Sequence, residues 1–164
     1  MLLSRKEAVL FASVLKFLHL LPSERETYVE DALAELSDAI AITAGEENFI
    51  VRKYIEDEFG NYQNVYIQRF ISNYIKLDVK IEEPDVQLFP CPCCGYKTLK
   101  FEKEYFICPV CYWEDDGVRD EGIYSSPNKM TLKEAKDRFR EFGVISNGLL
   151  KLVDPERMLK YSNT

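Results

Sequence analysis

Two pairs of cysteines near the middle of the chain constrain its fold more than any other feature. Cys91 and Cys94 form the first C-x-x-C pair, and Cys108 and Cys111 form the second; each pair opens with Cys-Pro. Tetrahedral zinc takes four thiolates, and a gap of two residues lets one tight turn direct two sulfurs at the same ion. The spacing therefore predicts one structural zinc per chain. Disulfides and a redox dithiol are the alternatives.

A fifth cysteine, Cys93, lies inside the first pair and has no counterpart in the second. It is either a small apolar residue packed in the turn, which we favour, or a reactive thiol. It could also replace Cys91 or Cys94 as a ligand. The two-residue gap and the following Gly95, which can adopt a left-handed conformation, favour the outer pair.

Composition limits the classes of protein to which this chain can belong. The chain has 164 residues, of which 46% are hydrophobic, enough for one domain or two small ones with a true core. Its formal net charge is −7, and neither half has an excess of basic residues. Since phosphate neutralisation supplies most nonspecific nucleic-acid affinity, this balance disfavours nucleic acid as a partner, and a basic protein is the expected one.

The cysteines and the apolar runs bear on localisation. Residues 8–21 are apolar but are interrupted by Lys16 and His19, and no segment approaches the roughly 20 apolar residues of a membrane span. An odd number of cysteines fits a reducing compartment. We expect a cytoplasmic protein without membrane contact, in an oligomeric state that the sequence does not define.

The first part of the chain, residues 1–80, is predicted to be a helical bundle. The first helix opens with the capping box Ser4–Glu7, ends before Pro22, and carries apolar residues almost all round, which predicts a central position. A similar signature at Ser23 predicts a second helix that stops near Gly45. Two more helices are expected at residues 46–59 and 61–77, and the short connections favour an antiparallel bundle.

The second part, residues 81–164, is predicted to be a zinc-ribbon domain with a C-terminal helix. An extended linker or edge strand at 78–88 leads into it. Between the cysteine pairs, residues 97–102 and 104–107 are strand-like and are expected to form the ribbon hairpin. A third capping box, Thr131–Glu134, predicts a helix that buries Phe139 and Phe142 and stops at Gly143. The predicted fold class is α+β, mostly α.

Several motifs in this part resemble those of the bacterial cysteine-rich CPCC proteins. The motifs are Cys91-Pro-Cys-Cys-Gly-Tyr-Lys-Thr-Leu99, Ile107-Cys-Pro-Val-Cys-Tyr-Trp-Glu-Asp-Asp-Gly117, Pro127-Asn128, and Leu132-Lys-Glu-Ala135 followed by Phe139, Phe142 and Gly143. The resemblance covers about residues 90–143. It implies a small zinc-binding domain with no assigned activity. Members often carry two glycines where this chain has Ser125 and Ser126.

Three consecutive carboxylates, Glu114, Asp115 and Asp116, follow the second cysteine pair. The simplest interpretation is a solvated turn, with Trp113 packed over the ribbon and one carboxylate capping backbone amides. Contact with a basic partner is the second interpretation, and general acid–base catalysis is the third. Four cysteine ligands would leave the zinc without an open position, which argues against catalysis.

Aromatic residues recur every four positions along the predicted fourth helix, at Tyr62, Tyr66, Phe70 and Tyr74. Such a ridge usually packs into a core, but tyrosine is also enriched at protein interfaces. We therefore retain Tyr62 and Tyr66, with the three carboxylates, as tentative partner-binding residues. The single histidine, His19, is expected to be a core or boundary residue.

The sequence favours a non-catalytic, zinc-binding protein-interaction module. Its most specific version is a bacterial immunity protein or antitoxin that neutralises a basic toxin. The alternatives are a nucleic-acid-associated zinc ribbon, and a redox protein or enzyme that uses Cys93 or the carboxylates.

Overall fold

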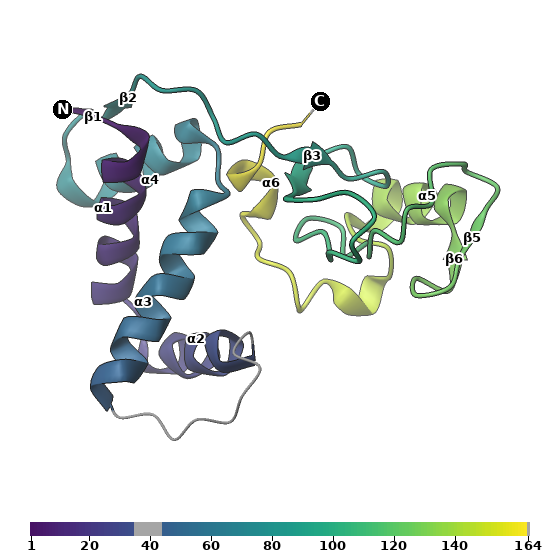
Figure 1. Ribbon diagram of the computed structural model, residues 1–164, viewed down its shortest axis with the longest axis horizontal. Coiled ribbons are helices and arrows are strands. Elements are labelled where there is room, and N and C mark those ends of the chain that lie inside the picture. The colour runs from purple at the N-terminus through teal and green to yellow at the C-terminus, as the bar shows by residue number, and fades with distance from the viewer. Residues whose placement is uncertain (35–43, 164) are drawn as a thin grey trace. The chain divides into compact units, whose positions relative to one another are not determined.

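The computed structural model describes residues 1–34 and 44–163 and divides the chain into two compact units, Met1–Asp85 and Val86–Thr164. The first unit is mainly helical, and the second combines short strands with helices (Figure 1). The fold class is α+β, mostly α, as predicted. Each unit is described separately below.

The described part of the first unit, residues 1–34 and 44–85, contains four helices and one small sheet. Helix α1 packs against α3 and α4, and α2 crosses α3 at a steep angle (Figure 1). Among residues 1–34 and 44–163, no helix is both long enough and apolar enough to cross a bilayer. The elements are β1 (Leu2–Leu3), α1 (Arg5–Leu18), α2 (Pro22–Ala34), α3 (Ala44–Gly60), α4 (Asn64–Ile75) and β2 (Lys80–Ile81).

Helix α1 begins at the predicted capping box, with Ser4 and Glu7 each satisfying a backbone N–H of the other. The helix has the central position that was predicted, since it contacts both α3 and α4, but it is not buried all round. Only Ala8, Ala12 and Ser13 are fully buried, whereas Leu10 and Leu18 are exposed. The small side chains form a stripe against which the neighbouring helices pack. The rest of the circumference is half-buried or exposed.

Helix α2 begins one residue before the predicted start. Pro22 is its first residue, and the Glu24 carboxylate accepts the Leu21 N–H at 2.8 Å, so Ser23 is not the cap. Gly45 lies in the first turn of α3 rather than after α2, and residues 35–43, over which the second helix was predicted to continue, lie outside the described residues. Leu36 and Ile40, which continue the apolar face of that predicted helix, also fall outside the described residues.

Aromatic and β-branched residues of α3 and α4 form the core of this unit. Tyr62 and Tyr66 are only 3% and 6% exposed, and the ring centroids of the two tyrosines lie 5.4 Å apart. Phe59 of α3 lies 5.1 Å from Tyr62 and 4.9 Å from Phe70. Tyr62 and Tyr66 are therefore core, whereas Phe70 is half-buried and Tyr74, at the end of the aromatic ridge, is 40% exposed. The two buried tyrosines do not form the exposed partner surface that was tentatively assigned to them.

The segment after α4 is the edge strand that was predicted as one alternative, and it pairs with a strand that was not predicted. β2 runs parallel to β1, with Leu2 opposite Lys80 and Leu3 opposite Ile81. Beyond β2, the Asp85 carboxylate accepts the backbone N–H of Asn64 at the first turn of α4. The segment from β2 to Asp85 is thus tied to the helical unit at both of its ends.

The second unit has three short helices and two small sheets. β3 pairs antiparallel with β4, and β5 with β6; Tyr96 also bridges to Asn163. The predicted hairpin between residues 97–102 and 104–107 was wrong, because Ile107 bridges to Glu114 instead. The elements are β3 (Phe89–Pro90), β4 (Lys97–Leu99), β5 (Tyr124–Ser125), β6 (Met130–Thr131), α5 (Leu132–Phe142), the 3-10 helix η1 (Asn147–Leu149) and α6 (Arg157–Lys160).

Helix α5 has the boundaries that its sequence predicted. Thr131 and Glu134 form the capping box, and Gly143 ends the helix in the left-handed conformation with φ of 75°. Leu132 and Ala135 are buried, whereas Phe139 is half-buried and lines a cavity beside the first cysteine pair. The helix places this half-buried ring next to the cysteines.

The buried position of Tyr66 predicts a stability effect. Tyr66→Ala should lower the free energy of unfolding of the full chain by roughly 3 kcal/mol, because it leaves a cavity beside Tyr62 and Phe70. Val65→Ala, on the exposed side of α4, should change it by less than about 0.5 kcal/mol. Chemical denaturation measures both. Equal stability of the two variants would contradict the core assignment.

Candidate metal centre

The four predicted cysteine ligands converge in the second unit. The sulfur atoms of Cys91, Cys94, Cys108 and Cys111 all lie within 4.8 Å of one another. Cys91 and Cys111 are 3.6 Å apart, as are Cys94 and Cys108. With Zn–S bonds of about 2.3 Å, a tetrahedral ion separates its sulfurs by about 3.8 Å. Four cysteines are therefore positioned to bind one metal ion, and none of the five forms a disulfide.

The two cysteine pairs are held by the same hydrogen-bond pattern. In the first turn, Cys91 N–H donates to Tyr96 O and Gly95 N–H donates to Cys91 O, each at 2.9 Å. In the second, Cys108 N–H donates to Trp113 O and Tyr112 N–H donates to Cys108 O, each at 2.8 Å. Each turn thus directs two sulfurs to one side.

This shared turn requires a left-handed residue directly after its second cysteine. Gly95 meets the requirement with φ of 81°, and Tyr112 takes the same place in the second turn with φ of 71°. Glycine adopts this conformation at little cost, whereas a residue with a Cβ atom loses roughly 1 kcal/mol or more. The second turn is therefore strained where the first is not, and convergence of the sulfurs has to offset that strain.

The electrostatics of the cluster fit a cation. Burial alone would raise the pKa of Cys108, but hydrogen bonds from Cys111, Cys91 and the Thr98 hydroxyl outweigh it and lower that pKa well below the usual thiol range. Hydrogen bonding to Cys108 raises the pKa of Cys91, and burial raises the pKa of Cys111. Cys108 held as a thiolate beside the thiols of Cys91 and Cys111 is part of a preformed ligand set, because a metal ion can replace the protons of those two thiols.

The centre is closed to solvent on most sides. Cys91 is 2% exposed, Cys108 and Cys111 are fully buried, and Cys94 is half-buried. An ion held by all four thiolates would have no free coordination position for water or substrate. These residues would therefore hold a structural metal, whose chemistry is to fix the two turns together.

The C-terminal segment supports both turns, which the sequence did not reveal. Arg157 is 8% exposed, and its guanidinium donates to Val110 O at 2.8 Å and to Gly143 O at 3.2 Å. It thereby links the second cysteine turn to the end of α5. Ile145 N–H donates to Cys111 O, and Lys97 N–H to Ser162 O, each at 2.9 Å. The neighbouring Asp154-Pro155 turn signals a local helix start but gives no sign of these long-range contacts.

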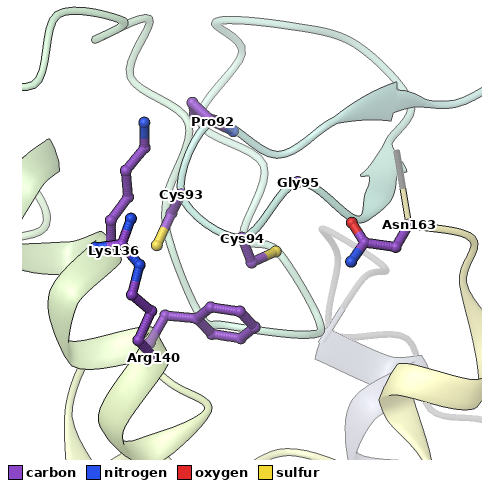
Figure 2. A pocket seen from close by; sticks show the side chains of 8 residues that line it. Pro92, Cys93, Cys94, Gly95, Lys136, Arg140 and Asn163 are labelled. Carbon is purple, nitrogen blue, oxygen red and sulfur yellow. The ribbon is translucent and has the colours of Figure 1, made fainter.

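Cys93 does not belong to the cluster. It is 6% exposed and lines a cavity of about 410 Å³ together with Phe139, Lys136 and Arg140 of α5. Figure 2 shows its sulfur directed toward the α5 side chains, while the Cys94 sulfur points in a different direction. Both cations have carboxylate partners: Lys136 pairs with Glu121, and Arg140 pairs with Asp137. The surroundings fit a packed small residue.

The carboxylate run is structural rather than exposed, which corrects the surface assignment of Asp115. Its side chain is fully buried and accepts hydrogen bonds from Arg119 at 3.0 Å and from Lys103 N–H at 2.8 Å. Burial would raise the pKa of Asp115, but these donors and the Gly117 N–H outweigh it and lower that pKa. Asp115 is the carboxylate that caps backbone amides, as one interpretation of the sequence proposed.

The other two carboxylates also lie in a hydrogen-bonded turn. Asp116 is half-buried and accepts the Ser125 hydroxyl at 2.8 Å. Glu114 is half-buried, and its backbone N–H and C=O both bind the Asn128 side-chain amide, at 2.9 and 2.8 Å. Asn128 also donates to Ser125. The geometry gives no support to catalysis by these three residues. The Asp115 and Asp116 carboxylates accept hydrogen bonds within the turn, and Glu114 is held there through its backbone.

Two further aromatic residues were assigned from sequence. Trp113 is fully buried, as predicted, and its indole N–H has no hydrogen-bond acceptor among the described residues. His19 belongs to the helical unit, where it is exposed and packs against Tyr74 with the rings tilted and their centroids 4.7 Å apart. It is a surface residue rather than a core one, and it is not part of the cysteine cluster.

The cluster predicts how cysteine substitutions affect metal content. Cys108→Ser should abolish stoichiometric metal binding and destabilise residues 86–164, because ligand binding and folding are coupled. Cys93→Ser should retain the metal, since its sulfur lies outside the cluster. Elemental analysis of the purified full-length variants, with thermal unfolding, measures both. A fully loaded Cys108→Ser protein would contradict the four-cysteine assignment.

Asp115 predicts a pH-dependent contribution to stability. A carboxyl group whose pKa is lowered by folding stabilises the native state above its ordinary pKa and loses that effect as the pH falls through the folded value. Asp115→Asn should therefore cost about 2 kcal/mol at neutral pH, and this difference from wild type should shrink below about pH 4.

Unfolding of wild type and Asp115→Asn at pH values from about 3 to 7 tests this prediction. Loss of metal in acid affects both proteins alike, so it does not alter the difference in stability between them. Glu141→Gln is the control, since that carboxylate lies exposed on α5. A difference between Asp115→Asn and wild type that is independent of pH would show that the ionised carboxylate is not the stabilising group.

Comparison with known proteins agrees with the motifs. Residues 89–158 match the family model described as cysteine-rich CPCC, a little under half of the chain. The match contains all four clustered cysteines, the carboxylate run, α5 and Arg157. No curated protein and no solved structure matches the chain. The segment from residue 89 to residue 158 is a cysteine-rich CPCC domain.

Proposed function

We propose that this protein is a non-catalytic interaction protein whose second unit is held together by a structural zinc ion. The proposal rests on the closed cluster of four cysteine sulfurs, which all lie within 4.8 Å of one another. Soft thiolates in a tetrahedral set select zinc or iron among the metals common in cells, and zinc is the usual occupant of structural sites made of four cysteines. In the cytoplasm such thiols stay reduced and available to the metal.

The proposed partner is a basic protein. The chain carries a formal charge of −7, which would become more negative when four thiolates bind a divalent ion. Such a charge accelerates association with a basic surface and disfavours binding to nucleic acid. The most specific form of the proposal is a bacterial immunity protein or antitoxin that occludes a basic toxin, for example a nuclease. Support for that form comes from the charge, the small size and the closed metal site.

We infer a contact surface other than the one assigned from sequence, because three of its five residues are buried. Asp115, Tyr62 and Tyr66 are buried, so charge reversal at Asp115 would unfold the turn rather than slow association. The partner must instead bind through exposed residues. A redox function through Cys93 receives no support from its packed position.

Two measurements test the proposal. Elemental analysis should find about one zinc per chain, and visible absorbance would instead indicate iron. The metal-loaded chain should then capture a basic protein from its native host, and co-expression should relieve any toxicity of that protein. Association should slow as salt rises from 0.1 to 1 M, where the Debye length falls from about 10 to 3 Å. Nanomolar binding to RNA or DNA at physiological salt, without a protein partner, would overturn the proposal.

A further inference from the structure

The loop between the two cysteine turns carries an exposed aromatic surface. Phe101 and Tyr105 are each 60% exposed, Phe106 is 40% exposed, and Phe89 of β3 is 45% exposed. Large contiguous apolar patches are uncommon on monomers and often mark interaction sites. Three of these rings surround a single hollow of about 600 Å³, here called the aromatic groove, whose lining residues are Phe89, Phe101, Glu102, Glu104 and Phe106.

The loop is fixed in a conformation that holds these rings outward. Buried Asp115 accepts the Lys103 N–H through its carboxylate and the Tyr105 N–H through its backbone carbonyl, and its own N–H donates to Phe106 O at 3.0 Å. Lys103 and Tyr105 both adopt left-handed conformations, with φ of 63° and 60°. Strained non-glycine residues of this kind tend to occur at functional sites. A loop held this firmly presents a preformed surface.

The chemistry of the groove favours a cation. Its only charged lining residues are two carboxylates. Glu102 is paired with Arg119 at 3.2 Å, whereas Glu104 has no counter-charge among the described residues. The rings of Phe101 and Phe106 lie 6.0 Å apart with an interplanar angle of 34°. Aromatic faces attract guanidinium and ammonium groups, and an adjacent unpaired carboxylate adds to that attraction.

We propose that the aromatic groove binds an arginine or lysine side chain of a basic protein segment. The aliphatic stem would lie against the phenylalanine rings, and the charged end would reach Glu104. This inference rests on the proposed function, because it assigns the contact surface for a basic partner. It places that surface on the loop between Cys94 and Cys108 rather than on the carboxylate run.

A peptide titration tests the groove without knowledge of the partner. The probe is a short synthetic peptide with two arginines in a glycine–serine background, added to the metal-loaded full chain and followed by amide chemical shifts. Shifts should be confined to the groove and its loop. The same peptide with two glutamates should cause none. Shifts elsewhere, equal shifts with both peptides, or no binding would overturn the inference.

Matched variants identify the residues responsible. Phe101→Ser and Glu104→Gln should each weaken arginine-peptide binding about 5-fold, equivalent to about 1 kcal/mol. Tyr124→Ser removes an equally exposed ring from β5, and Glu141→Gln removes an exposed carboxylate from α5; neither should alter the affinity. All variants should keep wild-type metal content, which separates lost binding from lost folding. Unchanged affinity in Phe101→Ser would overturn the inference.

Other occupants of the groove give different results. If a second copy of the chain fills it, sedimentation should show a dimer that Phe101→Ser dissociates, and the inference fails. If residues 1–85 cover the groove, the full chain should show contacts between these residues and the groove, and the inference fails in that case too. A captured basic partner that binds Phe101→Ser normally would leave the proposed function standing but refute the groove. Binding of the arginine peptide by a chain that captures no basic protein from its host would support the groove and refute the proposed function.

Discussion

Convergence of four cysteine sulfurs is the interaction on which the rest of residues 86–164 depends. The strands of this unit are two or three residues long, and its longest helix has 11 residues. Sheets this short are not stable alone, and so small a unit buries limited apolar surface. A metal ion would join two turns that are separated by a long loop, and it would contribute its binding free energy directly to folding. The binding free energy of such an ion would offset the backbone strain at Tyr112 and Lys103.

In this unit, two buried charged side chains hold backbone segments in place through hydrogen bonds, as β-sheet pairing does in other proteins. Asp115 receives backbone N–H groups of the loop before it, and Arg157 donates to backbone carbonyls of the second cysteine turn and of α5. A buried charge is costly unless its hydrogen-bonding capacity is used. Both residues form hydrogen bonds with backbone N–H or C=O groups of irregular segments, which no β-sheet hydrogen bonds pair. Side-chain hydrogen bonds therefore fix the conformations of the loops in this unit. Substitution of either residue would leave buried polar groups without partners.

The sequence predicted what depends on residues close together in the chain. Capping boxes at Ser4 and Thr131, the two cysteine turns and the end of α5 at Gly143 all rest on contacts within about five residues. The pairing of β1 with β2 and the roles of Arg157 and Asp85 depend on contacts across tens of residues. A single sequence carries no periodic signal for such contacts.

The same limit explains the errors over burial. Three adjacent acidic residues resemble a solvated turn, and only the location of Arg119 and of the preceding loop shows that Asp115 is enclosed. The ridge that includes Tyr62 and Tyr66 is equally compatible with a core and an interface until the position of Phe59 is known. Local pattern identifies the type of side chain, whereas its environment comes from elements distant in sequence.

The loop that carries most of the aromatic groove joins the two cysteine turns, so metal binding and partner binding would be thermodynamically coupled. Phe101, Glu104 and Phe106 lie in a loop whose ends are Cys94 and Cys108, so its conformation depends on closure of the cluster. A partner that binds only the closed loop would increase metal affinity, and the metal would increase partner affinity by the same factor. The metal would then be structural in its coordination and still control binding, because it determines whether the surface exists.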